Sequence, residues 1–339
     1  MRSQVVLYVI FLLPLTTVVL LILGSSRYDR RSGTVRGQGF LERNGAIVAT
    51  YLVLATFIWI FVTIIFPQIA MVDLSFRPNL PPRQAGGPDD HYTLDNYRYF
   101  LFGPPGSTDL FNFLHLNAYV ATIVASVCIT IFNFLLCYPI AYFMAQSAYP
   151  RTLRRLIAFL ILPYWVNEVL RVFAIRLLLS NSGIVNNVLI GTGILTEPVD
   201  FIGNNVGLYW GLSYSCILVM VFTLYNALES LEKSQIEAAR DLGAPWWHVH
   251  AFVAMPHAKP GIASGCSLTF MFCVGSLAAP LVLGGPRTLW FTPVIYNRFY
   301  QALNWPQGAA YAFILLVSCV IFVLVTLRLF RLRLGQIAR

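Results

Sequence analysis

Charged side chains are scarce in this sequence. Only 11% of its 339 residues are Asp, Glu, Lys or Arg, whereas 58% are hydrophobic and the mean hydropathy is +0.69. A soluble globular domain carries about 25% charged residues, which cover its surface. The shortage of charge therefore excludes a soluble protein and predicts an all-α polytopic membrane protein whose apolar helices cross the bilayer.

Motifs for chemistry are also missing. The sequence has no P-loop and no G-x-G-x-x-G stretch after a strand, and no Ser/His/Asp or paired-carboxylate set placed to share a pocket. We therefore expect no catalytic residue, no cofactor and no ATP site in this chain, so that any ATP-driven step needs a partner ATPase. The net charge of +9 does not indicate nucleic acid, because the basic residues lie in short loops without stacking aromatic residues.

Thiol and imidazole groups form no metal motif. His248, His250 and His257 include an H-x-H spacing, but no carboxylate or cysteine supports it, so we expect them to face a partner or water. The cysteines all fall inside apolar runs without C-x-x-C spacing, which predicts neither a disulfide nor a metal site. The six are Cys128, Cys137, Cys216, Cys266, Cys273 and Cys319.

Seven apolar runs have the length of about 20 residues that crosses a ~30 Å hydrocarbon core. The first is long for a signal peptide and has no A-x-A cleavage site, so we interpret it as a retained helix. A short amphipathic piece, Thr93–Leu101, is expected to lie along the outer interface. The runs are Val5–Leu23, Ala46–Ala70, Leu116–Met144, Leu156–Leu179, Val206–Leu228, Gly261–Leu283 and Ala309–Leu327.

Basic residues predict the orientation of these helices. Fifteen of the 23 Lys and Arg residues lie in four segments, 27–43, 151–155, 233–259 and 328–339. Positive residues accumulate on the cytoplasmic side of a membrane protein. We therefore expect these segments in the cytoplasm, the N-terminus outside and the C-terminus inside.

The polar stretch between the fifth and sixth runs has the pattern of a helix, a sharp turn and a second helix. Leu228, Leu231, Gln235, Ala238 and Leu242 recur at steps of three and four, which predicts a helix that continues into the cytoplasm. Its other face carries Glu229, Lys233, Glu237 and Arg240, at the spacing of ion pairs within a helix.

The turn itself is predicted from small and rigid residues. Gly243 suits a left-handed helix end, and Pro245 suits the first turn of the next helix. Trp246, Val249 and Val253 would form an apolar edge of that short helix, and Pro256 would end it.

Residues 237–256 resemble the EAA loop of binding-protein-dependent ABC importer permeases, E-A-A-x3-G-x9-I-x-L-P. Val253 and Met255 stand where that pattern has Ile and Leu. The resemblance extends over most of the chain to the first permease subunit of spermidine/putrescine importers. It rests on Leu74–Pro78, Thr93–Tyr97, Tyr138–Tyr142, Leu162–Ala174, Leu281–Pro286 and Asn304–Ala310.

This resemblance implies a type I ABC importer transmembrane domain with six core helices, plus one extra N-terminal helix. Residues 1–44 would hold the extra helix and a basic loop, and residues 45–339 the permease domain with a coupling loop at 229–260. Leu218 and Thr223 depart from the family, which usually has prolines in that span. The implied contacts with the ATPase are Glu237, Ala238, Ala239, Gly243, Pro245, Trp246 and Pro256.

The implied partners are a second, similar permease in a heterodimer, two ATP-binding subunits that hold ATP and Mg, and an external substrate-binding protein. The chain would lie in the bacterial cytoplasmic (inner) membrane. Polyamines are the first substrate expectation, followed by amino-acid derivatives, opines or ferric iron. Two rival functions remain open, a self-contained secondary transporter or channel and a membrane scaffold that transports nothing.

Charged residues inside the fourth run have two interpretations. Glu168 and Arg171 are three residues apart, so they can form an ion pair on one helical face. Alternatively, charged and aromatic groups at membrane depth line a path for an amine cation. The candidates for this path are Tyr164, Trp165, Glu168, Arg171, Tyr214 and Phe222, and Tyr209 and Trp210 are further aromatic residues of the same kind.

Overall fold

The computed structural model describes residues 45–331, apart from 82–83, 85–86, 105–110, 148 and 287. The predicted helix Val5–Leu23 and the basic loop after it lie outside the described residues. Every regular element within the described residues is helical, which confirms the all-α prediction. The chain divides into two compact units, Met1–Asp73 and Leu74–Arg339.

In the first unit, α3 (Gly45–Ile60), η1 (Phe61–Ile65) and the start of α4 (Phe66–Ser75) follow one another without a break. The stretch Thr50–Ser75 is long and apolar enough to cross a membrane, as predicted for Ala46–Ala70. The wider π-type turns of η1 come just before Pro67, which lacks the N–H that an α-helix would use at that point.

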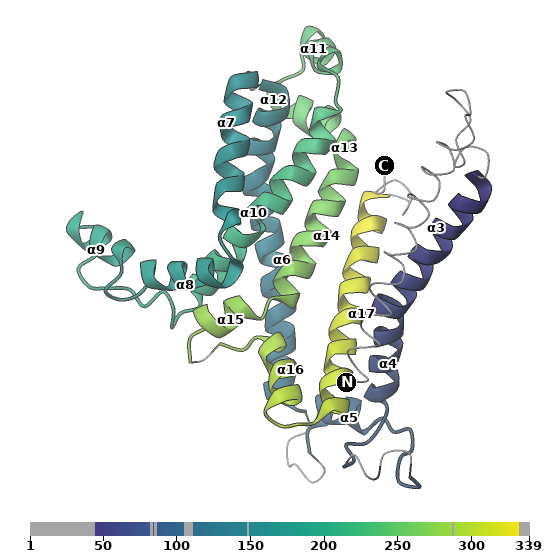
Figure 1. The fold of residues 1–339 in the computed structure, drawn as a ribbon. Coiled ribbons are helices and arrows are strands. Elements are labelled where there is room, and N and C mark those ends of the chain that lie inside the picture. The colour runs from purple at the N-terminus through teal and green to yellow at the C-terminus, as the bar shows by residue number, and fades with distance from the viewer. Residues whose placement is uncertain are drawn as a thin grey trace, which may run out of the picture. The chain divides into compact units, whose positions relative to one another are not determined.

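The second unit is built around three helices that pack side by side (Figure 1): α6 (Phe113–Tyr142), which η2 (Phe143–Ser147) prolongs, α10 (Val206–Glu229) and α14 (Lys259–Gly275). α17 (Trp305–Phe330) packs against α14. The large side chains between these helices are apolar and fully buried, including Met220, Leu224 and Phe270. This bundle is the frame on which the candidate sites are placed.

Two glycines allow α14 to approach α10 closely. Gly261 and Gly265 are four residues apart, the small-xxx-small spacing that lets membrane helices pack backbone to backbone. A Cβ atom added to Gly261 would lie 2.4 Å from the Ala227 Cβ and 2.7 Å from the Thr223 carbonyl oxygen. The absence of side chains at these two positions therefore allows α14 to pack this closely on α10.

Gly261→Ala is expected to lower the thermal stability of the protein, because α14 must move away from α10. Overpacking of this kind costs about 1–3 kcal/mol. Gly275→Ala is the matched control, since nothing lies within 4 Å of a Cβ added there. The measurement is the unfolding temperature of both variants in detergent. Equal temperatures for the two would show that the close approach is not needed.

The run Leu156–Leu179, predicted as one span, is not one straight helix. It consists of α7 (Pro150–Ile161), η3 (Leu162–Trp165) and α8 (Glu168–Leu178), with a bend of 94° between the two parts. The bend follows Pro163, and the Asn167 side chain caps a new helix by accepting the Val169 N–H at 2.8 Å. α8 and α9 (Ile184–Gly191) extend sideways from α7 (Figure 1).

The number of spans also differs from the prediction. Four helices in the described part of the chain are long and apolar enough to cross a membrane, or five if the bent pair is one span. The predicted span Gly261–Leu283 is interrupted at Ser276 and Leu277, so that α15 (Ala278–Leu283) is separate from α14 and packs against α8. A count of six core helices is therefore not confirmed.

Short helices close the end of the bundle where α6 begins. α5 (Asp95–Phe102) confirms a helix in the predicted amphipathic piece, and α16 (Phe291–Tyr300) lies near it (Figure 1). Phe100 of α5 is buried, with its ring centroid 5.7 Å from those of Tyr119 and Phe291 and 5.4 Å from that of Tyr311. One face of α5 thus packs on protein.

Candidate functional site

The opposite end of the bundle carries an elbow, defined as residues 230–258. It contains α11 (Lys233–Asp241), α12 (Trp246–His248), η4 (Val249–Ala254) and α13 (Met255–His257), and leads into α14. The predicted continuous helix through residues 228–242 is wrong, because α10 ends at Glu229. Gln146 of η2 donates hydrogen bonds to the carbonyl oxygens of Leu228 at 2.7 Å and Leu231 at 3.0 Å, which satisfies groups that a helix end leaves open.

The turn of the elbow has the geometry that its glycine predicts. Gly243 has φ +79°, in the left-handed region. Its N–H donates to the Arg240 carbonyl at 2.8 Å, and the Ala244 N–H donates to the Ala239 carbonyl at 3.1 Å. These two bonds close the end of α11 as a Schellman motif.

The second arm differs in two details from the sequence prediction. Pro245 precedes α12 as its N-cap residue and is not inside its first turn. Pro256 does not end the helix but lies within α13, and the chain stays helical to His257. The π-type turns of η4 lie just before this proline, and such turns change the backbone hydrogen-bond pattern that an α-helix interior would require there.

The elbow buries one set of apolar residues and exposes another. Leu231, Ile236, Val249 and Ala254 are buried in a cluster with Tyr138 and Met144 of the α6–η2 segment. The exposed side chains are Leu242 (89%), Trp246 (74%), Phe252 (69%) and Trp247 (52%). Leu242 therefore does not belong to the packed stripe, and Ile236 takes its place.

Polar residues of the elbow are largely exposed. Glu237 and Ala238 are exposed, and Ala239 is partly buried. The predicted ion pairs along α11 are not found among the described residues. Glu229 instead accepts a hydrogen bond from the Tyr225 hydroxyl at 2.8 Å. The exposed acid, the small residues and the exposed aromatic rings all lie within residues 237–252 of the elbow.

One histidine of the elbow, His250, fixes it to the bundle, contrary to the expectation that it faces a partner or water. His250 Nδ1 lies 3.0 Å from the Tyr138 hydroxyl, and its ring lies 4.3 Å from that of Tyr142. Burial, and then the nearby charge of Arg240, lower the pKa of His250. His257 Nε2 lies 2.9 Å from the Ser230 hydroxyl. No group of three or more metal-ligating side chains occurs within the described residues.

A second cluster lies at the bend between α7 and α8. The Tyr164 hydroxyl lies 2.8 Å from the Tyr214 carbonyl oxygen and 3.1 Å from that of Ser215, and it accepts the Leu218 N–H at 3.0 Å. The Arg171 guanidinium lies 4.6 Å from the Tyr164 ring centroid and 5.8 Å from that of Tyr214. Three of the six path candidates, Tyr164, Arg171 and Tyr214, are therefore in contact.

The other three path candidates are not joined to this cluster by a described contact. Glu168 makes no ion pair with Arg171 within 4.0 Å, and the Nε and Nη1 atoms of Arg171 are buried without a hydrogen-bond partner in the described chain. Trp165 is exposed and Phe222 is partly buried further along α10. The cation–π contacts of Arg171 take the place of the expected ion pair.

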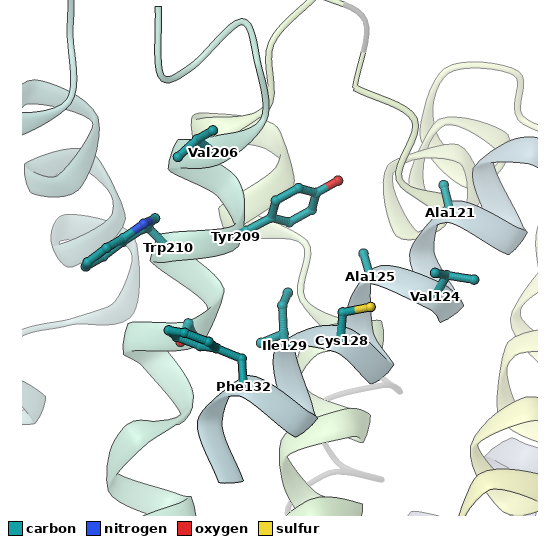
Figure 2. A pocket seen from close by; sticks show the side chains of 10 residues that line it. Ala121, Val124, Ala125, Cys128, Ile129, Phe132, Val206, Tyr209 and Trp210 are labelled. Atoms are coloured by element: carbon teal, nitrogen blue, oxygen red, sulfur yellow. The ribbon is translucent and has the colours of Figure 1, made fainter. Parts of the chain in front are cut away.

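A groove that the sequence did not predict runs between α6 and α10. Its volume is about 570 Å³, and Figure 2 shows Tyr209 and Trp210 of α10 on one side and the α6 side chains on the other. A smaller hollow of about 170 Å³ shares Ala121 and Tyr209 with it. None of the six path candidates lines either hollow. The groove is lined by Ala121, Val124, Ala125, Cys128, Ile129, Phe132, Val206, Tyr209, Trp210 and Ser213.

A weak signal for this groove is present in the sequence. Ala121, Ala125 and Cys128 follow one another at steps of four and three, so small side chains lie on one face of α6. This row of small residues on α6 lies opposite the large aromatic residues of α10, and the space left between them is the groove. Because the pairing of α6 with α10 cannot be read from the sequence, this signal could not have been used alone.

Known proteins resemble the chain in both sequence and fold. Residues 120–333 match the family described as "Binding-protein-dependent transport system inner membrane component". The chain is 30% identical over 272 residues to the spermidine/putrescine transport system permease protein PotB of Haemophilus influenzae, covering 80% of this chain and 90% of that protein. PotB of Escherichia coli is also 30% identical, over 275 residues, covering 81% and 94%.

Among solved structures, a chain of a bacterial alginate ABC transporter, in complex with an alginate pentasaccharide-bound periplasmic protein, superposes with a TM-score of 0.64. The identity is 20%, and the match covers 86% of this chain and 96% of that chain. At this identity the likeness concerns the fold alone.

Proposed function

The chain belongs to the family of binding-protein-dependent transport system inner membrane components, and on this premise we propose how it works as the permease subunit of an ABC importer. The elbow at residues 230–258 receives the motion of a partner ATPase, and the solute is a polyamine. The observation that supports coupling most strongly is the elbow itself, which is fixed to the bundle on one side and exposes large apolar rings on the other.

The elbow has the properties of a docking element. Leu242, Trp246, Trp247 and Phe252 expose apolar surface at the end of the molecule that the basic residues predict to be cytoplasmic. Large apolar and aromatic side chains surrounded by polar residues favour a protein interface. Glu237 and Ala238, next to the Gly243 turn, offer a carboxylate and a close approach to the backbone. A groove on an ATP-binding subunit would bind this surface.

The buried side of the elbow transmits a displacement. His250 contacts Tyr138, and Gln146 bonds to the carbonyl groups at the end of α10. A push on α12 therefore reaches α6 and α10 through direct contacts. Because these two helices line the groove, movement of the elbow changes the separation of the groove walls.

The proposed partners follow from the missing ATP motif and from the relatives. Two ATP-binding subunits with ATP and Mg, a second permease and an external substrate-binding protein complete the transporter. Two PotB proteins of spermidine/putrescine systems are 30% identical to this chain, which supports a polyamine as the solute. In this arrangement the elbow and the C-terminus are cytoplasmic.

Reconstitution of the complex tests this proposal. The chain is purified with the second permease, the ATP-binding subunits and the binding protein, and is placed in proteoliposomes. We expect spermidine or putrescine uptake that needs ATP and the binding protein, and ATP hydrolysis stimulated by the loaded binding protein. Uptake by this chain alone, without ATP, would instead identify a self-contained transporter. ATP-dependent uptake of another solute, with none of a polyamine, would contradict the substrate only.

A further inference from the structure

The groove between α6 and α10 has polar groups at its two ends and apolar walls between them. The smaller hollow joins its outer end through Ala121 and Tyr209, and adds Asn117, Asn205 and Thr288 to the lining. Ser213 lies at the other end of the α10 side. Eight residues separate Asn205 from Ser213, which corresponds to about 12 Å along a helix. This layout matches an elongated solute with polar ends.

The two hydroxyl groups at these ends have already used their hydrogen atoms. Ser213 Oγ donates to Asn133 Oδ1 at 2.7 Å, and Thr288 Oγ1 donates to Asn205 Oδ1. A hydroxyl has one hydrogen and two lone pairs. Each of these two hydroxyl oxygens can therefore only accept a further hydrogen bond, so each can bind a donor group of a ligand.

Hydrogen-bond donors are present in the lining as well, because Asn117, Asn205 and Tyr209 carry N–H or O–H groups. The indole nitrogen of Trp290 and the amide nitrogen of Asn133 are buried and have no hydrogen-bond partner among the described residues. Both hollows lack Lys, Arg, Asp and Glu among the described residues that line them, so no fixed charge repels a cation or holds it tightly.

Aromatic rings and aliphatic side chains form the walls between the two ends. Tyr209 and Trp210 of α10 and Phe132 of α6 line the groove, and Figure 2 labels their rings. The face of such a ring attracts an ammonium group by about 0.5–2 kcal/mol. Val124 and Ile129 offer apolar contact to a methylene chain. Several weak sites, and no strong one, are what a solute in transit requires.

We propose that this groove is a solute-contact site of the permease itself, for a linear aliphatic amine. The ammonium groups contact the Ser213 and Thr288 oxygens and the rings of Tyr209 and Trp210, and the methylene chain lies against Val124 and Ile129. This inference rests on the proposed transport function. Tyr209 and Trp210 were already path candidates from the sequence, whereas Val124, Ile129, Ser213 and Thr288 were not. No Lys or Arg of the described lining would hold an anionic solute here.

The test uses the assembled transporter in proteoliposomes, with spermidine as the probe. Trp210→Leu removes the ring from the groove, and Trp210→Phe keeps one. We expect uptake by Trp210→Leu to fall about tenfold, a change of the size of one desolvated cation–π contact, and Trp210→Phe to retain most of it. The yield of the assembled complex is measured for both variants, and we expect it to equal that of the wild type because the elbow is intact.

A second pair of variants tests the hydroxyl oxygens. Ser213→Ala with Thr288→Val should reduce spermidine uptake, at unchanged yield of the assembled complex. The matched control is Ser264→Ala with Thr326→Val, whose hydroxyls bond to carbonyls of their own helices and line neither hollow. If wild-type protein imports spermidine and all groove variants import it equally well, the groove is not the contact site. If the wild type imports no polyamine, the proposed substrate fails instead.

Discussion

Gly243→Val is expected to abolish most ATP-driven uptake, while the chain still inserts into the membrane. Gly243 has φ +79°, and an L-residue in the left-handed region costs about 1–2 kcal/mol, and more when it is β-branched. No atom lies within 4 Å of a Cβ added there, so the effect comes from the backbone. The two Schellman hydrogen bonds that close the end of α11 would be lost. The orientation of α12 relative to α11 would then vary, and its exposed rings would no longer bind a partner in a single orientation.

Gly243→Asn is the matched control, because asparagine tolerates the left-handed region better than other L-residues. We expect it to keep substantial uptake and a complex that co-purifies with the ATPase. The measurement is ATP-dependent uptake in proteoliposomes, together with the amount of ATPase that remains bound to the permease. Wild-type uptake by Gly243→Val would show that the elbow does not couple.

Tyr164→Phe is expected to have the second largest effect. Its hydroxyl contacts two carbonyl oxygens and one N–H of α10, and it thus fixes the 94° bend to that helix. Removing the hydroxyl leaves buried backbone groups with fewer partners, at a cost of about 1–3 kcal/mol. The unfolding temperature should fall, and uptake should fall with it, because the bend before α8 loses one of its attachments to α10.

Tyr214→Phe is the matched control for this prediction. The two rings stack, with centroids 6.4 Å apart, and the Tyr214 hydroxyl makes no hydrogen bond within the described chain. Its removal should leave the unfolding temperature close to that of the wild type. Equal stability of both variants would contradict a structural role for the Tyr164 hydroxyl. A loss of uptake without a loss of stability would favour the original interpretation, in which Tyr164 contacts the solute.

Local signals predicted the local geometry of the elbow well. Gly243 was expected in a left-handed turn because only its missing Cβ makes that conformation inexpensive, and it is there. The prediction of one continuous helix through Leu228, Leu231 and Leu242 was wrong, because periodicity does not show where a helix stops. The stop depends on Gln146, some 80 residues earlier in the chain, whose side chain binds the carbonyl groups at the end of α10.

Contacts between residues far apart in the chain also determine the partners of the charged and titratable residues. Glu168 and Arg171 are correctly spaced for an ion pair, yet Arg171 lies against the rings of Tyr164 and Tyr214. His250 lies in a polar segment, and none of its neighbours in the chain predicts its contact with Tyr138. In both cases the observed partner comes from another helix. The spacing of residues within one helix does not predict such a partner.

The sequence by itself determined that the chain is an all-α membrane protein, that it carries no ATP motif, and that residues 237–256 form a turn between two helices. These properties depend on composition and on neighbours a few residues apart. Only the tertiary structure decided that the fourth apolar run bends at Asn167, that the elbow is fixed to α6, and that small residues of α6 face Tyr209 and Trp210 across a groove. The physical reason is that such features depend on how distant helices pair. In a membrane this pairing depends on close packing and interhelical hydrogen bonds, because the lipid is as apolar as the helix surfaces and apolarity alone selects no partner.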